Sequence, residues 1–256
     1  MTSINTNVGA LNARSSAIRA TAKMESAMER LSSGLRINSA ADDAAGLAVA
    51  GKMESQLRGI NMSVRNAQDG VGLIQTAESG LNEIRNMVLR IRELAVQMAN
   101  GIYEDTPDRD NAQLEVAALI AQVTLIAENS TFNDVKLLDG SFTSITIQAG
   151  NAVAETIELS FIDVASSGLA IDTATVATQS DAKVAMATMD TALQTIAGEQ
   201  ATMGSLVNRL NFSVANLSKA SVMTEQAIGR VMDADFAAET TNLSKQQILN
   251  QAATSM

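Results

Sequence analysis

The composition of this 256-residue chain excludes several classes of protein before any element is placed. It has neither cysteine nor histidine, which removes disulfides, thiolate and imidazole metal ligands, and the Ser-His and Cys-His catalytic pairs. The net charge is −10 and aromatic residues make up only 2%, so the chain lacks both a basic stripe for nucleic acid and a bulky aromatic core. Residues 101–190 hold fourteen acidic and three basic residues, so we expect this middle region to face water and the nearly neutral ends to be buried.

The first predicted element is an amphipathic helix over residues 4–35. A polar hinge follows over residues 33–43, where Ser39 and Asp42 have the spacing of a capping box for the next helix. A helix this polar is marginal until its apolar stripe is covered, so it is either a surface helix of the same domain or an arm for assembly. Its apolar stripe consists of Ile4, Val8, Leu11, Ile18, Leu31 and Leu35.

A heptad repeat over residues 53–95 predicts a long helix with a coiled-coil seam. At a rise of about 1.5 Å per residue this helix would be roughly 65 Å long, and it therefore needs a partner. Asn100-Gly101 is a helix-stop signal, and Thr106-Pro107 provides the cap and first position of a second helix over residues 108–128. The seam consists of Met53, Ile60, Ala67, Ile74, Leu81, Val88 and Ala95.

Two runs rich in β-branched residues, 142–149 and 156–162, alternate in hydrophobicity as strands do. Gly150-Asn151 lies between them, so a β-hairpin is predicted there, whereas residues 130–141 read as loop and turn. A lone hairpin is barely stable in water. We therefore expect this one to lie on the helices.

A second long seam occupies the C-terminal part of the chain, and Ser180 is placed to cap its helix. The periodicity breaks between Ile228 and Phe236, and a final helix is predicted over residues 237–253. The seam contains Met189, Ile196, Met203, Leu210, Leu217 and Val231, and the final helix carries Leu243, Ile248 and Leu249 as its apolar residues.

The order of these elements predicts a mainly α fold in which the chain turns back on itself. The two seams would form a long antiparallel coiled-coil or helical-bundle rod, with the N- and C-terminal helices paired and a small β-hairpin region at the turn. The predicted domains are a terminal helical polymerisation domain with its hinges (1–43 and 228–256), a helical rod domain (44–140 and 180–227) and a short variable region (141–179).

Several runs of residues resemble those of bacterial flagellin. Near the N-terminus they are INTN at 4–7, LSSGLRINSAADDAAGLA at 31–48, RGI at 58–60, NAQDG at 66–70, QTAE at 75–78 and RELAVQ at 92–97. Near the C-terminus they are DADFA at 233–237 and LSKQQILNQA at 243–252. The resemblance covers both ends of the chain, and ordered matches of this length are far more specific than a heptad pattern.

The resemblance implies an extracellular structural subunit that polymerises into the bacterial flagellar filament for motility. Such a subunit is exported unfolded and assembles at the distal tip. The implied partners are further copies of the chain, a flagellar export chaperone, and the cap and hook-junction proteins. The family pattern also has a larger variable region than residues 141–179 provide, and it continues as apolar helix beyond residue 256, so we expect the C-terminal end to be incomplete.

Three residues carry a second implication of the resemblance. Arg90, Leu94 and Glu115 match positions by which many flagellins engage the Toll-like flagellin receptor of animal hosts. The alternative is structural, since Leu94 could pack in the core and Arg90 could form ion pairs on the helix surface.

Two other functions share some of these features: a hook-filament junction protein, which has similar termini, and a flagellin-like glycan-binding protein at the cell surface. An enzyme is not expected, because Gly70-Val71-Gly72 lies inside the seam with no preceding strand. The acidic pairs Asp42-Asp43 and Asp233/Asp235 read as solvated helix ends, so neither a metal nor a cofactor is expected. Residues 1–10 lack the features of a signal peptide, and no stretch approaches 18 apolar residues, so membrane insertion is not expected.

Overall fold

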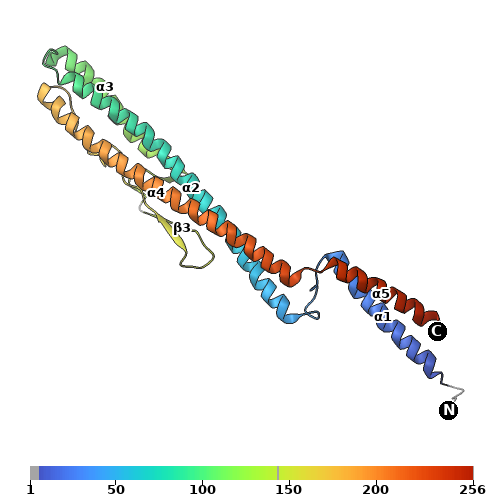
Figure 1. The fold of residues 1–256 in the computed structure, drawn as a ribbon. Helices are drawn as coiled ribbons and strands as arrows, with labels where there is room; N and C mark the ends of the chain where they lie inside the picture. Colours follow the sequence, from blue (N-terminus) through green and yellow to red (C-terminus); the bar gives the residue numbers. More distant parts are fainter. Residues whose placement is uncertain (1–5, 143, 256) are drawn as a thin grey trace. The chain divides into compact units, whose positions relative to one another are not determined.

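The computed structural model describes residues 6–142 and 144–255, and it confirms the predicted fold class of paired long helices with small two-stranded sheets (Figure 1). The elements in chain order are α1 (Val8–Ser33), α2 (Ala44–Met98), the π-helical turn η1 (Asp105–Arg109), α3 (Asp110–Asn129), β1 (Thr131–Phe132), β2 (Val135–Lys136), β3 (Ile145–Gln148), β4 (Thr156–Leu159), α4 (Gln179–Met232) and α5 (Phe236–Ser255).

The chain divides into two compact units, each described by itself. Residues up to 58 and from 219 onward form one unit, called here the terminal unit, which contains α1 and α5. Residues 59–218 form the central unit, which contains α3 and all four strands. The long helices α2 and α4 contribute residues to both units.

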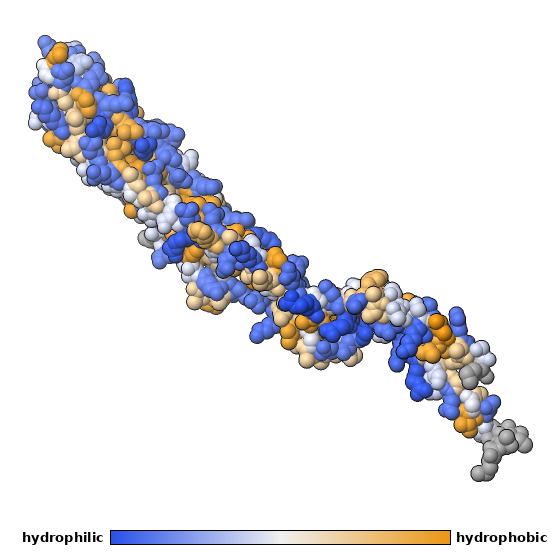
Figure 2. Space-filling view, in the orientation of Figure 1, coloured by the Kyte–Doolittle hydropathy of each residue, from blue (hydrophilic) through white to orange (hydrophobic). Residues whose placement is uncertain are grey.

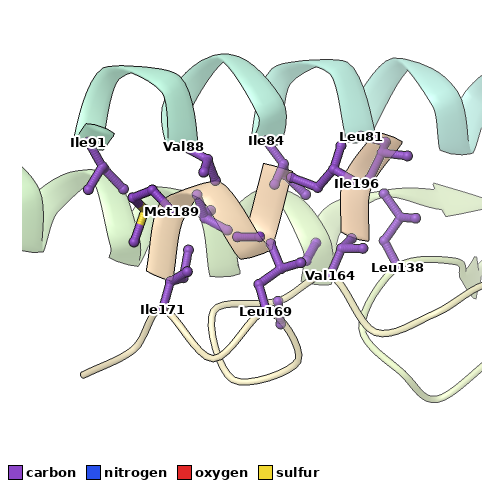
Figure 3. Packing of buried hydrophobic residues seen from close by; sticks show 14 of the residues in the cluster. Leu81, Ile84, Val88, Ile91, Leu138, Val164, Leu169, Ile171, Met189 and Ile196 are labelled. Atoms are coloured by element: carbon purple, nitrogen blue, oxygen red, sulfur yellow. The ribbon is translucent and has the colours of Figure 1, made fainter. Parts of the chain in front are cut away.

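In the central unit α2 and α4 run antiparallel, as predicted. Gln200 Nε2 donates a hydrogen bond of 2.7 Å to Asn82 Oδ1, and Arg92 further along α2 pairs with Asp190, which lies earlier in α4. Figure 3 shows the apolar side chains that meet in this core. They include Leu81, Ile84, Val88 and Ile91 from α2 and Met189 and Ile196 from α4.

The predicted α2 seam forms the core of the central unit. From Ile60 to Ala95 every member of that seam is buried, and α3 adds Val116 and Val123. Each fully buried leucine or isoleucine contributes about 1.5–3 kcal/mol relative to an exposed one. The connection before α4, which is rich in Ser, Thr and Ala, closes another side of this core (Figure 3). Its buried side chains are Val164, Leu169, Ile171 and Val176.

The predicted β-hairpin is present and lies on the two long helices. Strands β3 and β4 are antiparallel, with Ile145 opposite Leu159. Ser213 of α4 donates a 3.1 Å hydrogen bond to Ala149 O at the hairpin turn, and Asn66 of α2 donates one of 3.4 Å to Gln148 O. The helices therefore supply the support that an isolated hairpin lacks.

A second, smaller hairpin was not predicted. Strands β1 and β2 have two residues each and lie in the segment expected to be loop. Asn133 and Asp134 between them have φ angles of 49° and 63°. Two consecutive positive φ values are typical of a type I′ hairpin turn, in which Asn and Asp are tolerated. The strands are too short to give a visible alternation, so only the Asn-Asp pair could have revealed this turn.

In the terminal unit α1 and α5 are antiparallel. Asn250 Nδ2 donates a 2.6 Å hydrogen bond to Thr21 Oγ1. The segments that connect these helices to α2 and α4 are also joined to each other, because Arg36 N donates to Met232 O at 2.6 Å and Ala234 N donates to Gly34 O at 3.0 Å. Gly34 has a φ of 74°, so the left-handed end of α1 requires glycine at that position.

Two predicted helix caps differ from those in the structure. Helix α2 is capped by Asp43, whose Oδ1 accepts from Gly46 N at 2.9 Å, whereas Asp42 accepts from Ser39 N and closes the preceding turn. Helix α4 is capped by Thr178, not Ser180. Adjacent polar residues compete for each cap, and the tertiary path of the entering chain selects one of them.

Two further boundaries differ from the prediction. Pro107 lies within η1, and α3 begins only at Asp110, because Thr106 has extended dihedral angles inside this turn. Helix α4 continues to Met232, so the predicted break of nine residues is reduced to the three residues between α4 and α5. Gly229 is accommodated inside α4, since a glycine weakens a helix without ending it.

Candidate functional site

The apolar residues of the first and final predicted helices, which together form the predicted polymerisation stripe, divide between two environments. Val8, Leu11 and Ile18 on α1 are 60%, 54% and 60% exposed, and Ile248 and Leu249 on α5 are 66% and 46% exposed. Figure 2 shows apolar surface among the hydrophilic residues of these two helices. Leu31, Leu35 and Leu243 are half-buried, whereas Ile4 lies outside the described residues.

Helix α1 buries alanine rather than its larger apolar side chains. Ala20 and Ala27 are its buried residues, and Ala13 and Ala17 on the same face are half-buried. The three- and four-residue spacing of these alanines defines a helix face, and their small side chains let a neighbouring helix approach closely. The alanine spacing is visible in the sequence. The predicted stripe was based on the large apolar residues alone. Of these, Val8, Leu11 and Ile18 lie on a different face of α1 and remain exposed in the terminal unit.

The three candidate receptor residues lie around one hollow in the central unit. Arg90 of α2 forms a 2.9 Å ion pair with Glu115 of α3 and a second one of 3.3 Å with Glu93. Both partners raise the pKa of Arg90, first through the Glu115 hydrogen bond and then through that of Glu93. Leu94, in contrast, is only 4% exposed and belongs to the hydrophobic core.

The hollow beside Arg90 and Glu115 has a volume of about 330 Å³. Its lining is mostly polar and comes from α2, α3 and the segment between them, including Gln97, Tyr103 and Asn111. The exposed Arg90–Glu115 pair at this hollow offers charged groups to a partner, whereas Leu94 contributes mainly to packing.

Arg109 has a structural role that is not visible in the sequence, where it is only one of three basic residues in the acidic middle region. Its side chain is almost completely buried and stabilises the C-terminal end of α2. Arg109 donates hydrogen bonds to Met98 O (3.0 Å), Asn100 O (3.0 Å) and Tyr103 O (2.6 Å), and to Asp105 Oδ1 at 2.6 Å. A cation at a helix C-terminus satisfies carbonyls that have no partner within the helix and complements the helix dipole.

Glu199 is a second feature that the seam pattern concealed. It occupies a core position of α4 and is 7% exposed, so burial raises the pKa of its carboxyl, partly offset by a hydrogen bond from Ile162 N. Its Oε1 atom is buried without a hydrogen-bond partner among the described residues. A buried carboxylate with one oxygen unsatisfied is costly, so Glu199 weakens the central unit at neutral pH.

The acidic pairs act as turns and caps. Asp235 Oδ1 accepts hydrogen bonds from Ala237 N (2.9 Å) and Ala238 N (3.2 Å) at the start of α5, and Asp42 and Asp43 order the start of α2. Within residues 6–142 and 144–255, no group of acidic side chains is arranged to hold a metal ion. None of the helices in this described part of the chain is long and apolar enough to cross a membrane.

Paired long helices that leave apolar stripes exposed on α1 and α5 are typical of structural proteins that associate with further copies of themselves. Two family models match the chain: the bacterial flagellin N-terminal helical region over residues 4–143 and the bacterial flagellin C-terminal helical region over residues 186–256. The chain belongs to the bacterial flagellin family. It is a non-enzymatic, extracellular subunit of the flagellar filament.

Several characterised proteins are similar to the chain over 99% of its length. They are the flagellin of Halalkalibacterium halodurans (37% identity, 93% of that protein), the flagellin of Bacillus subtilis (33%, 94%) and the flagellar filament 33 kDa core protein of Treponema phagedenis (37%, 94%). The crystal structure of Bacillus cereus flagellin aligns with a TM-score of 0.55 and 34% identity, over 60% of this chain and 88% of that one.

Proposed function

We propose that the terminal unit provides the main contacts between subunits and that the central unit acts as the stable body of each subunit. Residues 1–43 and 228–256 are then the polymerisation domain, residues 44–140 and 180–227 the rod domain, and residues 141–179 a short variable region. The observation that carries this proposal is the exposure of large apolar side chains on α1 and α5. Head-to-tail contacts between copies would cover them and produce an open helical assembly.

The expected contribution of one such contact can be bounded. Fully burying a valine, leucine or isoleucine side chain is worth about 1.5–3 kcal/mol. Ile18 and Ile248 are roughly two-thirds exposed, so covering either one would contribute about 1–2 kcal/mol. Since about 1.4 kcal/mol corresponds to a tenfold change in an equilibrium constant, losing one contact is expected to raise the critical concentration roughly 5- to 30-fold.

The test is elongation of sheared filaments by purified full-length subunits. Ile18→Ser and Ile248→Ser are expected to raise the critical concentration by the factor given above, with little change in monomer stability because both side chains are exposed. Val153→Ser is the matched control, since Val153 is 95% exposed at the hairpin turn in the central unit. Equal critical concentrations for all three variants would refute the proposal. A wild-type chain that never forms long homopolymers would favour the hook-filament junction role.

We also propose the more specific partners that family membership implies. The stripes on α1 and α5 must be covered before polymerisation, which an export chaperone would do. The cap and hook-junction proteins would contact the same helices at the two ends of the filament. Exposed stripes of this kind are typical of segments that complete their packing only on binding. Binding of an export chaperone that is insensitive to Ile248→Ser would argue against this assignment.

A second proposed function is binding of the Toll-like flagellin receptor through Arg90, Leu94 and Glu115. It is supported by the exposed Arg90–Glu115 pair beside an open hollow. Arg90 supplies a planar set of donors for a partner carboxylate, and Glu115 orients it. Because Leu94 is buried, its proposed role is to hold α2, and with it Arg90, in position through packing in the core.

The receptor proposal is tested by binding of monomer to the receptor ectodomain. Arg90→Ala is expected to weaken binding at least tenfold, which corresponds to about 1.4 kcal/mol or more for a charged contact. Arg92→Ala is the matched control, because Arg92 pairs with Asp190 of α4 and is absent from the hollow. Leu94→Ala would also create a cavity and lower the stability of the monomer. The free energy of unfolding of this variant is therefore measured before its receptor binding is compared with wild type. Full binding by the Arg90→Ala, Leu94→Ala double variant would refute the proposal.

A further inference from the structure

The Asn100-Gly101 pair has a chemical consequence beyond ending α2. Both residues are exposed in the turn that follows the helix, and the neighbouring Ile102 is 82% exposed. Glycine after asparagine leaves the peptide nitrogen sterically open, since it has no Cβ. Asn100 and Gly101 are therefore accessible to water.

The fold also polarises both carbonyl groups of Asn100. Its side-chain Oδ1 accepts a hydrogen bond from Ile102 N at 3.2 Å. Its main-chain oxygen accepts from the Arg109 guanidinium at 3.0 Å, a charge-assisted bond held in place by burial of the arginine. Donors directed at a carbonyl oxygen stabilise the negative charge that develops when a nucleophile attacks its carbon.

We propose that Asn100 is a site of spontaneous deamidation, with isoaspartate as the main product. Gly101 N, after losing its proton to solvent base, attacks Asn100 Cγ, and the Ile102 N–H stabilises the oxyanion on Oδ1. The Cγ–Nδ2 bond then breaks, and the nitrogen leaves as ammonia after taking a proton from water. The result is a cyclic succinimide between residues 100 and 101, and no oxidant or cofactor takes part.

Water then opens the succinimide at one of its two carbonyls. Attack at the former main-chain carbonyl frees an α-carboxylate and leaves the chain connected through Cγ, which is isoaspartate. Arg109 is hydrogen-bonded to that carbonyl oxygen, so it directs water to this carbon and then pairs with the carboxylate formed there. The alternative product is aspartate, whose side-chain carboxylate is not paired with Arg109. It lies at the C-terminal end of α2, where the helix dipole disfavours an anion.

The test follows amide loss in the native full-length chain during warm incubation at mildly alkaline pH, in water enriched in heavy oxygen. Trypsin releases residues 93–109, a peptide in which Asn100 is the only asparagine. We expect the deamidated form of this peptide to accumulate with one heavy oxygen. Fragmentation of the peptide in a mass spectrometer should identify most of it as isoaspartate. Asn151, which is exposed in the hairpin turn but followed by Ala152, is the internal control and should convert far more slowly.

Two variants separate the steps. Gly101→Ala is expected to suppress the conversion strongly, and Arg109→Lys is expected to lower the share of isoaspartate without stopping succinimide formation. An unincubated sample corrects for conversion during digestion. Conversion at Asn100 no faster than at Asn151, or unaffected by Gly101→Ala, would overturn the proposal, and an unchanged product ratio in Arg109→Lys would remove the role assigned to Arg109.

Discussion

The buried guanidinium of Arg109 gives the sharpest stability prediction for the central unit. Arg109→Met keeps most of the aliphatic stem but removes donors to the carbonyls of Met98, Asn100 and Tyr103. A hydrogen bond to a charged group is worth about 1.5–3 kcal/mol, and a buried acceptor left without a donor costs about 1–3 kcal/mol. The Asp105 ion pair adds little, because that carboxylate is mostly exposed.

These contributions do not simply add, because the turn at Asn100 is exposed and water can replace part of what is lost. We therefore expect Arg109→Met to lower the free energy of unfolding of the central unit by about 2–4 kcal/mol. Arg109→Lys should give a smaller loss, because a single ammonium cannot reproduce the planar fork of donors. The loss should be much the same from pH 6 to 8, a range in which arginine stays charged.

The assay is urea unfolding followed by the fluorescence of Tyr103, the only tyrosine in a chain that has no tryptophan. Tyr103 contacts the Arg109 guanidinium through its carbonyl, so its signal reports the affected region. Arg85→Met is the control, because Arg85 is exposed on α2 and should change stability by no more than about 0.5 kcal/mol. If Arg109→Met behaved like Arg85→Met, the assignment of Arg109 as the cap of α2 would be refuted.

Three further predictions concern the central unit. Gly70→Val should destabilise the central unit by about 1–3 kcal/mol in urea unfolding, because even a Cβ at that position would lie 3.3 Å from Ile147 of the hairpin. Gly70→Ala gains helix propensity and should be closer to neutral in the same assay. Burial holds the folded-state pKa of Glu199 above its unfolded value near 4.5, so stability is lost as pH rises above that value. Glu199→Gln should therefore gain stability over wild type at pH 7, and lose this advantage at pH 4, in parallel melts. Thr178→Ala should cost about 1 kcal/mol by removing the cap that Asp181 N bonds to, whereas Ser180→Ala should not.

The sequence predicted the elements whose burial follows a strict period. Residues of the α2 seam recur every seven positions, and those from Ile60 to Ala95 are buried as expected. The β3–β4 hairpin was predictable because Ile145 and Leu159 lie in alternating runs on either side of a Gly-Asn turn. A seven-residue repeat is compatible only with a helix, and strict alternation only with a strand, and each pattern also fixes which face is buried.

The missed features depend on groups that the period does not encode. Arg109 binds carbonyls of residues that precede it by six to eleven positions, so its role appears only when the chain turns back after α2. The cap of α4 could have been Thr178 or Ser180, and local propensity does not separate them. The burial of Glu199 is likewise not encoded in the period, and its hydrogen bond comes from Ile162, 37 positions earlier in the chain.

Helix α1 shows why the face that a helix buries cannot always be read from its largest residues. Val8, Leu11 and Ile18 form the more hydrophobic stripe, yet Ala20 and Ala27 are the residues buried in the terminal unit. Helix α1 buries only alanine and α5 has no fully buried residue, so their contact removes little apolar area from water and is only weakly stabilised. Under the proposed function this weakness has a purpose. The terminal helices gain most of their stabilisation when neighbouring subunits cover the larger side chains, so assembly and completion of folding are driven by the same buried area.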